Sequence, residues 1–207
     1  VIDTGDATAA PVTVRLIYTT PNYFRLLDID PVLGIPPPAG ADVMQLTTSP
    51  SAMISYAMWQ REFGGAGDVI GRTLRVNDTP IEIVGVAPRA FSGTDGGRGM
   101  TMWLPLAAYP VLQKRTTAAF ISHDSLFLSA TARLRPGITA EAATPVVAGL
   151  AERAFRGGQG SAATLARRET GSADVVPLLA SNSRVSTRGD LVMSGGVAGG
   201  FALLILL

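Results

Sequence analysis

Cysteine is absent from the 207-residue sequence, and histidine occurs only once, as His123. The absence of cysteine excludes a disulfide within this chain, a thiolate nucleophile, and zinc or iron–sulfur ligation through sulfur. A histidine-dependent catalytic triad would have to use His123, and no G-x-S-x-G motif supplies a partner serine. We interpret His123, in "ISHDS", as an ordinary loop residue, and we expect that the chain is not an enzyme.

Charge is also scarce, since charged residues make up 16% of the sequence against roughly 25% in typical soluble domains. The net charge is +1 and the arginines are scattered, so we expect no nucleic acid partner. Asp28 and Asp30, in "DIDP", form the tightest carboxylate pair. A metal site needs several converging ligands, so we expect this pair to cap or solvate a helix end. We predict no catalytic, cofactor-binding or metal-ligating residues and no cofactor.

Two glycine clusters resemble phosphate-binding loops only superficially. "GGAGDVIG" places Gly71 one position too late for the dinucleotide fingerprint that Gly65 and Gly67 would begin, and it follows a helix instead of a strand. "GTDGGRG", from Gly93 to Gly99, lacks the GK[ST] ending of a P-loop. We interpret both clusters as turns.

Alternating apolar residues predict strands in the first half of the chain. The first is Val12–Tyr18, and a helix should follow it, capped by Thr20 and burying Tyr23, Phe24 and Leu27. A short buried strand, Ala52–Ser55, should lead into a helix that carries Met58, Trp59 and Phe63 and ends at Gly64 and Gly65. The turn "NDTP" between two alternating runs predicts a hairpin over Thr73–Ala87.

The later part of the chain adds an apolar segment, Met102–Leu106, and an ambiguous stretch, Ala107–His123, that could contain a short helix. Leu126–Arg135 alternates as a strand, and Val175–Leu179 has the composition of a returning strand. Between them, Thr139–Phe155 has a helical apolar stripe. Pro145 leaves two alternatives open: the helix is kinked there, or it begins there with Thr144 as its cap.

The last 17 residues, Leu191–Leu207, contain no charge. Two overlapping G-x-x-x-G pairs, Gly195/Gly199 and Gly196/Gly200, are typical of closely packed helices in lipid. We interpret the run as the start of a transmembrane helix. Arg184 and Arg188 precede it, but the charges alone do not decide on which side of the membrane the domain lies. The chain begins at Val1 without a signal peptide, and we expect a further segment upstream.

Five blocks occur in an order that resembles one known family: "PNYFRLLDIDPVLG", "AMISYAMWQREFGG", "DVIGRTLRVNDTPIEIVGVAP", "FSGTDGG" and "MWLPL". They are similar to the periplasmic core domain of MacB-like ABC transporter permeases, in particular permease-only members of the acidobacterial type. The resemblance covers about Val12 to Leu207. The chain departs from the family after "LG", where an Arg-x-Phe and an acidic residue usually follow and "IPPPAGAD" stands instead.

The resemblance implies an α+β fold, in which a porter-like α/β subdomain carries an inserted small β-rich subdomain at about residues 64–110. Residues 1–180 would form the periplasmic core domain, 181–190 a linker, and 191–207 the start of a transmembrane helix. The domain would lie on the periplasmic face of a bacterial inner membrane.

As to function, the resemblance implies a relay of ATP-driven conformational change to a periplasmic substrate or protein partner, as in efflux by mechanotransmission. ATP hydrolysis would occur on a separate ABC ATPase subunit, reached through the membrane part, and a second permease chain would be a further partner. The alternative is a periplasmic binding or scaffolding module of an FtsX-like or lipoprotein-trafficking system.

Overall fold

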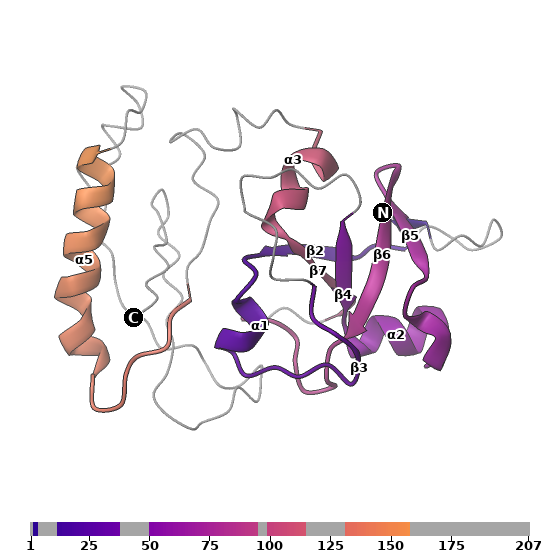
Figure 1. Ribbon diagram of the computed structural model, residues 1–207, viewed down its shortest axis with the longest axis horizontal. Coiled ribbons are helices and arrows are strands. Elements are labelled where there is room, and N and C mark those ends of the chain that lie inside the picture. The colour runs from indigo at the N-terminus through magenta and orange to yellow at the C-terminus, as the bar shows by residue number, and fades with distance from the viewer. Residues whose placement is uncertain (1, 4–11, 38–49, 95–98, 115–130, 158–207) are drawn as a thin grey trace. The chain divides into compact units, whose positions relative to one another are not determined.

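The computed structural model describes residues 2–3, 12–37, 50–94, 99–114 and 131–157, which Figure 1 draws as coloured ribbon. The described residues up to 114 belong to one compact unit, and residues 131–157 belong to another. The first unit holds a sheet with short helices, and the second holds one long helix, α5 (Ala140–Gly157).

Seven strands form one mixed sheet in the order β1–β5–β6–β4–β7–β2, and β3 also pairs with β6. The pairs β5–β6 and β4–β7 are antiparallel, whereas β4–β6 and β2–β7 are parallel. The strands are β1 (Ile2–Asp3), β2 (Arg15–Thr19), β3 (Leu33–Gly34), β4 (Ser51–Ile54), β5 (Thr73–Val76), β6 (Thr79–Val86) and β7 (Thr101–Pro105). The helices of this unit are α1 (Tyr23–Leu26), α2 (Tyr56–Phe63) and α3 (Tyr109–Leu112), with 3-10 turns at Gly67–Val69 and Leu106–Ala108.

This arrangement confirms a mixed α/β fold rich in sheet. The hairpin expected over Thr73–Ala87 is present as β5 and β6, and it lies in the same sheet as β2 and β4. An inserted β-rich subdomain at residues 64–110 therefore stays a prediction. The short helix expected between Ala107 and His123 is α3.

The sheet is packed on both faces. Alternate residues of β4 point to opposite sides, and Ala52 and Ile54 join a core in which Met58 of α2 and Leu112 of α3 are fully buried. On the other face Met53 pairs in register with Trp103 of β7. There the rings of Phe24 and Phe91 pack against Trp103, at centroid distances of 6.1 and 5.0 Å. Because apolar side chains cover both sides, the middle of the sheet is a closely packed body.

Helix α1 begins two residues later than the predicted cap at Thr20 implies, so that cap was wrongly assigned. The residue at its N-terminal boundary is Asn22, and the hydroxyl of Thr20 donates to the Asn22 side chain at 2.8 Å instead of capping the helix. The predicted burial of Tyr23, Phe24 and Leu27 is confirmed.

Strand β3 was not predicted, and it pairs antiparallel with β6 in a register that sets Gly34 opposite Gly85. A Cβ on Gly34 would stand 2.1 Å from the Val84 carbonyl oxygen, and one on Gly85 would stand 2.3 Å from the Ile35 carbonyl oxygen. Gly34 also has a φ of +70°. The two backbones approach so closely that neither position has room for a side chain.

Helix α5 begins at Ala140 and runs through Pro145, so the alternative start at Pro145 with Thr144 as cap is wrong. The Thr139 hydroxyl accepts a hydrogen bond from the Ala142 amide at 3.3 Å, which places the cap five residues earlier than that alternative. The Thr144 hydroxyl donates to the Ala140 carbonyl instead.

Other predicted elements fall partly or wholly outside the described residues. Residues 131–135 contain no strand, so that part of the strand predicted over Leu126–Arg135 is wrong. Residues 126–130, the strand predicted at Val175–Leu179, the linker at 181–190 and the apolar run Leu191–Leu207 lie outside the described part.

Candidate functional site

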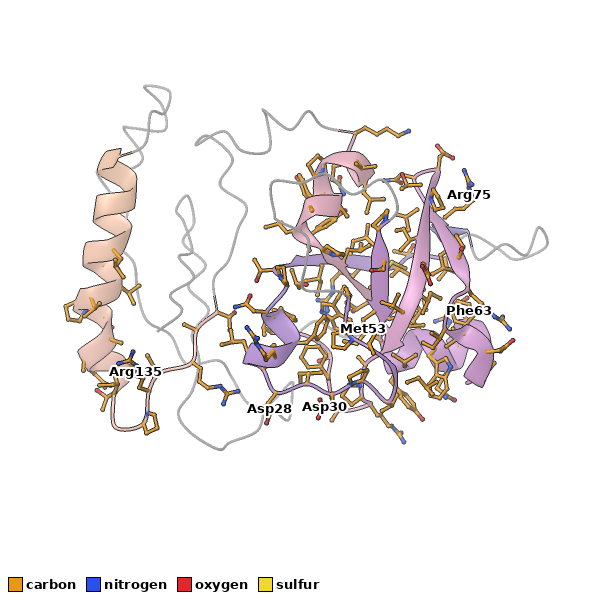
Figure 2. All side chains as sticks on the ribbon, viewed as in Figure 1. Asp28, Asp30, Met53, Phe63, Arg75 and Arg135 are labelled. Atoms are coloured by element: carbon orange, nitrogen blue, oxygen red, sulfur yellow. The ribbon has the colours of Figure 1, made fainter. Side chains whose placement is uncertain are left out.

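The carboxylate pair of the sequence, Asp28 and Asp30, lies at the exposed end of α1 and marks the close of a helix (Figure 2). The Asp28 amide donates to the Arg25 carbonyl at 3.2 Å and the Ile29 amide to the Phe24 carbonyl at 2.9 Å. With Asp28 at a φ of +58°, these two bonds form a Schellman motif. The prediction that the pair ends a helix is confirmed. In the described part of the chain, no group of three or more Asp, Glu or His side chains is placed to hold a metal ion.

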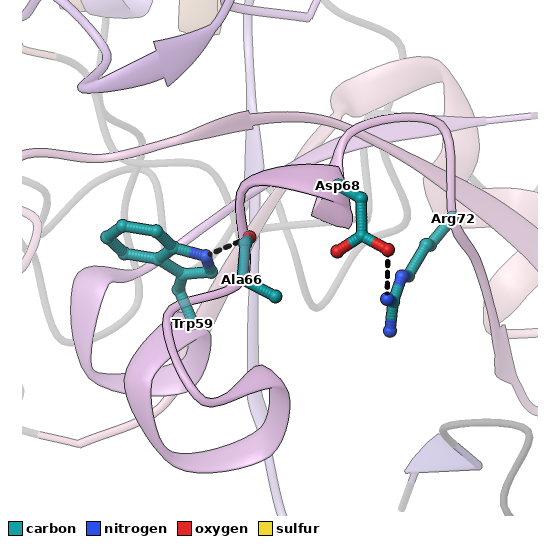
Figure 3. Close-up of polar contacts among 4 residues, drawn as sticks. All are labelled: Trp59, Ala66, Asp68 and Arg72. Atoms are coloured by element: carbon teal, nitrogen blue, oxygen red, sulfur yellow. Dashed lines mark hydrogen bonds and ion pairs between the residues drawn. The ribbon is translucent and has the colours of Figure 1, made fainter.

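The first glycine cluster forms the connection between α2 and β5, as predicted. Gly64 ends α2 in the left-handed conformation, and Gly65 and Gly71 also have positive φ values. The indole Nε1 of Trp59 donates to the Ala66 carbonyl at 2.9 Å and fixes the returning chain against the helix (Figure 3). These glycines therefore form a turn. The cluster lies between α2 and β5, whereas a dinucleotide-binding loop follows a strand and leads into a helix.

The same connection carries an ion pair between Asp68 and Arg72, four residues apart (Figure 3). The Arg72 guanidinium, by hydrogen bond and by charge, lowers the pKa of the Asp68 carboxyl. Both side chains are exposed to solvent, so the pair is screened and serves mainly to order the turn.

The second glycine cluster, from Gly93 to Gly99, is described only at its two ends. Phe91, just before the cluster, packs against Trp103. Within the cluster, the Thr94 hydroxyl accepts a hydrogen bond from the Tyr23 hydroxyl at 3.3 Å. The described part of this loop is therefore anchored on the aromatic face of the sheet.

Ser55 is a buried polar residue whose role was missed when it was assigned to a strand. Its Oγ accepts hydrogen bonds from the amides of Met58, at 3.3 Å, and Thr101, at 3.0 Å. The Ser55 amide in turn donates to the Thr101 carbonyl at 2.9 Å. Ser55 thus caps α2 and ties it to β7. A serine at a strand-to-helix boundary is the sequence signal that could have revealed the cap.

The tip of the β5–β6 hairpin contacts the end of α3, and we call Asn77, Asp78, Leu112 and Lys114 the hairpin junction. The Asn77 side-chain amide donates to the Leu112 carbonyl at 2.9 Å, across 35 residues of sequence. The Lys114 ammonium lies 3.8 Å from the Asp78 carboxylate, with both side chains largely exposed. Asn77, Asp78 and Lys114 all have positive φ values, between 48° and 69°.

Helix α3 is itself held on the sheet. The Tyr109 ring packs edge-on against Tyr18 of β2 at 5.0 Å, and Gln113 donates to the Tyr18 hydroxyl at 3.0 Å. Burial, the largest influence on this phenol, raises the Tyr18 pKa. The end of α3 therefore has fixed contacts with both β2 and the hairpin.

Val32, Ile35 and Ile70 are exposed apolar residues, and the first two flank β3 in the sequence. Their exposed fractions are 46%, 62% and 37%. The side chain of Ile70 stands over the bare backbone of Gly34. Single exposed apolar residues are common on protein surfaces, so these three do not by themselves indicate a ligand.

His123 and the four glycines of the terminal run lie outside the described residues. None of the helices in the described ranges is long and apolar enough to cross a membrane. The notable contacts of the described residues are thus apolar packing and the hydrogen bonds that hold helices and turns on the sheet.

Comparison with known proteins identifies the chain's relatives. A family model, the MacB-like periplasmic core domain, matches residues 2–150. Among curated proteins none matches.

Several solved structures are similar to the chain, among them the following three. The extracellular domain of the noncanonic ABC-type transporter YknZ from Gram-positive bacteria is 17% identical, with a TM-score of 0.38, covering 48% of this chain and 46% of that one. The periplasmic region of MacB from Actinobacillus actinomycetemcomitans is 12% identical, with a TM-score of 0.40, covering 56% and 47%. A domain of a putative permease from Porphyromonas gingivalis is 19% identical, with a TM-score of 0.44, covering 73% and 64%. The chain thus spans about half of the first two.

Proposed function

Because this chain belongs to the family of MacB-like periplasmic core domains, we propose that it is the extracytoplasmic domain of an ABC-type transporter permease. The observation that carries the proposal is the family match over residues 2–150, a range that contains every strand of the described sheet. In this role the domain faces the periplasm and relays conformational change, driven by ATP hydrolysis on a separate subunit, to a substrate or protein in that compartment.

The packing of the sheet unit supports a mechanical role. A relay element has to move as one body, because a soft domain would absorb the displacement that it should pass on. The sheet is covered by apolar side chains on both faces, and Met53, Met58, Trp103 and Leu112 are fully buried. Ser55 adds buried hydrogen bonds that link α2 to β7. These features give the unit the stiffness that the role requires.

Attachment to the inner membrane is proposed for the apolar run Leu191–Leu207, whose length and composition suit the first part of a spanning helix. The ABC ATPase subunit and a second permease chain are the partners that this role requires. Contact with the ATPase would pass through membrane segments outside this sequence.

Labelling of single cysteines in intact cells tests the proposal. The chain lacks cysteine, so one can be introduced at a chosen position of the full-length protein after any cysteine outside this sequence has been replaced. Arg61→Cys places a thiol at a side chain that is 74% exposed. Met58→Cys places one at a fully buried position of the same helix and is the matched control.

We expect a membrane-impermeant maleimide to label the Arg61→Cys variant once the outer membrane is opened, without lysis of the inner membrane. The Met58→Cys variant should react only after denaturation. Labelling of the Arg61→Cys variant that requires disruption of the inner membrane would contradict the proposal. Recovery of the full-length protein in the aqueous fraction would contradict the membrane attachment.

A further inference from the structure

The hairpin junction connects the β1–β5 pair with the end of α3. At the N-terminal side, β1 pairs with β5 in the register Ile2↔Val76 and Asp3↔Arg75. The residue after Val76 is Asn77, whose side chain binds the Leu112 carbonyl near the last described residue of the unit, Lys114.

We propose that the hairpin junction is a mechanical coupling point, through which a displacement at β1 or at the end of α3 is passed to the β5–β6 hairpin. The load-transfer role rests on the proposed function as a relay, whereas the coupling itself is a property of the fold. Strand β1 pairs with β5, and the end of α3 is bound by Asn77, the residue that follows β5.

The Asn77–Leu112 hydrogen bond has a defined structural task. The last carbonyl groups of a helix have no partner within the helix. At the end of α3, Gln113 and Lys114 amides donate to the carbonyls of Tyr109 and Val111, and the Asn77 amide supplies the donor for Leu112. A helix of one turn depends on such contacts from other elements, because it is too short to be stable alone. Loss of the Asn77 donor should therefore loosen the end of α3.

The turn is suited to hold this geometry. Asn77 and Asp78 both have positive φ, as a type I′ turn requires, and the Arg75 guanidinium donates to the Asp78 carbonyl at 2.8 Å. Asparagine is the residue that accepts this conformation and also carries an amide donor. The Asp78–Lys114 pair is a weaker contact, since it is long and exposed.

Hydrogen exchange of the full chain, followed amide by amide, tests the coupling. Asn77→Gly keeps the type I′ conformation and removes only the side-chain donor, so the hairpin should still form. Asp78→Gly is the matched control, since it also keeps the turn but leaves the Asn77–Leu112 bond in place. We expect Asn77→Gly to speed exchange of the Gln113 and Lys114 amides about fivefold, as loss of one hydrogen bond implies.

Coupling further requires that Asn77→Gly speeds exchange of the amides in the β1–β5 pair by about threefold or more. The control Asp78→Gly should change exchange at the end of α3 and in the β1–β5 pair by less than about twofold. Faster exchange in α3 alone would overturn the proposal, because the bond would then be only a local cap. Unchanged exchange in both regions, or equal acceleration by both substitutions, would overturn it as well. Each result is independent of the cysteine labelling, so failure of the coupling and failure of the permease role are distinguishable.

Discussion

Replacement of Gly85 by alanine should destabilise the sheet unit by roughly 2–4 kcal/mol. The new Cβ would stand 2.3 Å from the Ile35 carbonyl oxygen, whereas such contacts are essentially never shorter than 3.0 Å. Strand β3 would have to retreat by about 0.7 Å. That movement lengthens two hydrogen bonds that hold β3 on β6, Ile35 amide to Val84 carbonyl at 2.9 Å and Val32 amide to Val86 carbonyl at 2.8 Å. Overpacking contributes about 1–3 kcal/mol, and the two weakened hydrogen bonds together contribute about 1 kcal/mol.

Urea unfolding followed by tryptophan fluorescence measures this loss, because Trp103 is fully buried in the folded sheet. With a slope of about 2 kcal/mol per molar urea, the midpoint should fall by about 1–2 M. Gly67→Ala is the matched control: no atom lies within 4 Å of its added Cβ, so the midpoint should stay within about 0.25 M of the wild type. If the unfolding free energy of Gly85→Ala also stays within about 0.5 kcal/mol of the wild-type value, the close approach of β3 to β6 is refuted.

Three further predictions concern turns and caps. Asp28→Gly should raise the unfolding free energy by about 0.5–1 kcal/mol in thermal or urea unfolding, because glycine adopts a φ of +58° without strain, while Asp30→Gly should give no gain. Ser55→Ala should lower the free energy by about 1–3 kcal/mol in the same assay, since it leaves two buried amides without an acceptor; a loss below about 0.5 kcal/mol would contradict the role of the cap. Arg72→Gln should raise the Asp68 pKa toward its ordinary value in a carboxyl NMR titration. Because the wild-type pKa is lowered, the stabilising ion pair is fully present above the ordinary pKa and is lost as pH falls through the folded-state pKa. If the Asp68 titration does not move, Arg72 is not the cause of the lowered pKa.

Elements with a local signal were predictable from the sequence. The β5–β6 hairpin has alternating strands on both sides of Asn77 and Asp78, and turn chemistry of this kind acts within four residues. Helix α2 has its apolar residues and its closing Gly64 in the expected places. The apolar stripe of α5 predicted the helix, which runs through Pro145 and has its cap at Thr139.

Elements that depend on distant partners were not predictable. Strand β3 has two residues, too few for an alternating pattern, and exists because Gly34 meets Gly85 some fifty residues later. Asn77 gave a turn signal, but its bond to Leu112 depends on how the sheet folds. Helix α1 shows the same dependence on tertiary structure. Thr20 is of a residue type that often caps helices, yet its hydroxyl donates to the Asn22 side chain. Local composition indicates which residues can cap or turn, and the tertiary fold decides which of them do.

The parallel pairing of β2 with β7 brings together strands whose paired residues are 86 positions apart, Arg15 with Thr101. Among the described strands β7 alone pairs with β2, so during synthesis β2 has no partner strand until β7 has emerged. Contacts between such distant segments form slowly, and the unpaired strand is a site for aggregation until they do. A chain that stalls before residue 101 keeps β2 unpaired and should need a holding chaperone or be degraded, which makes delivery of β7 the step that commits this domain to its native state.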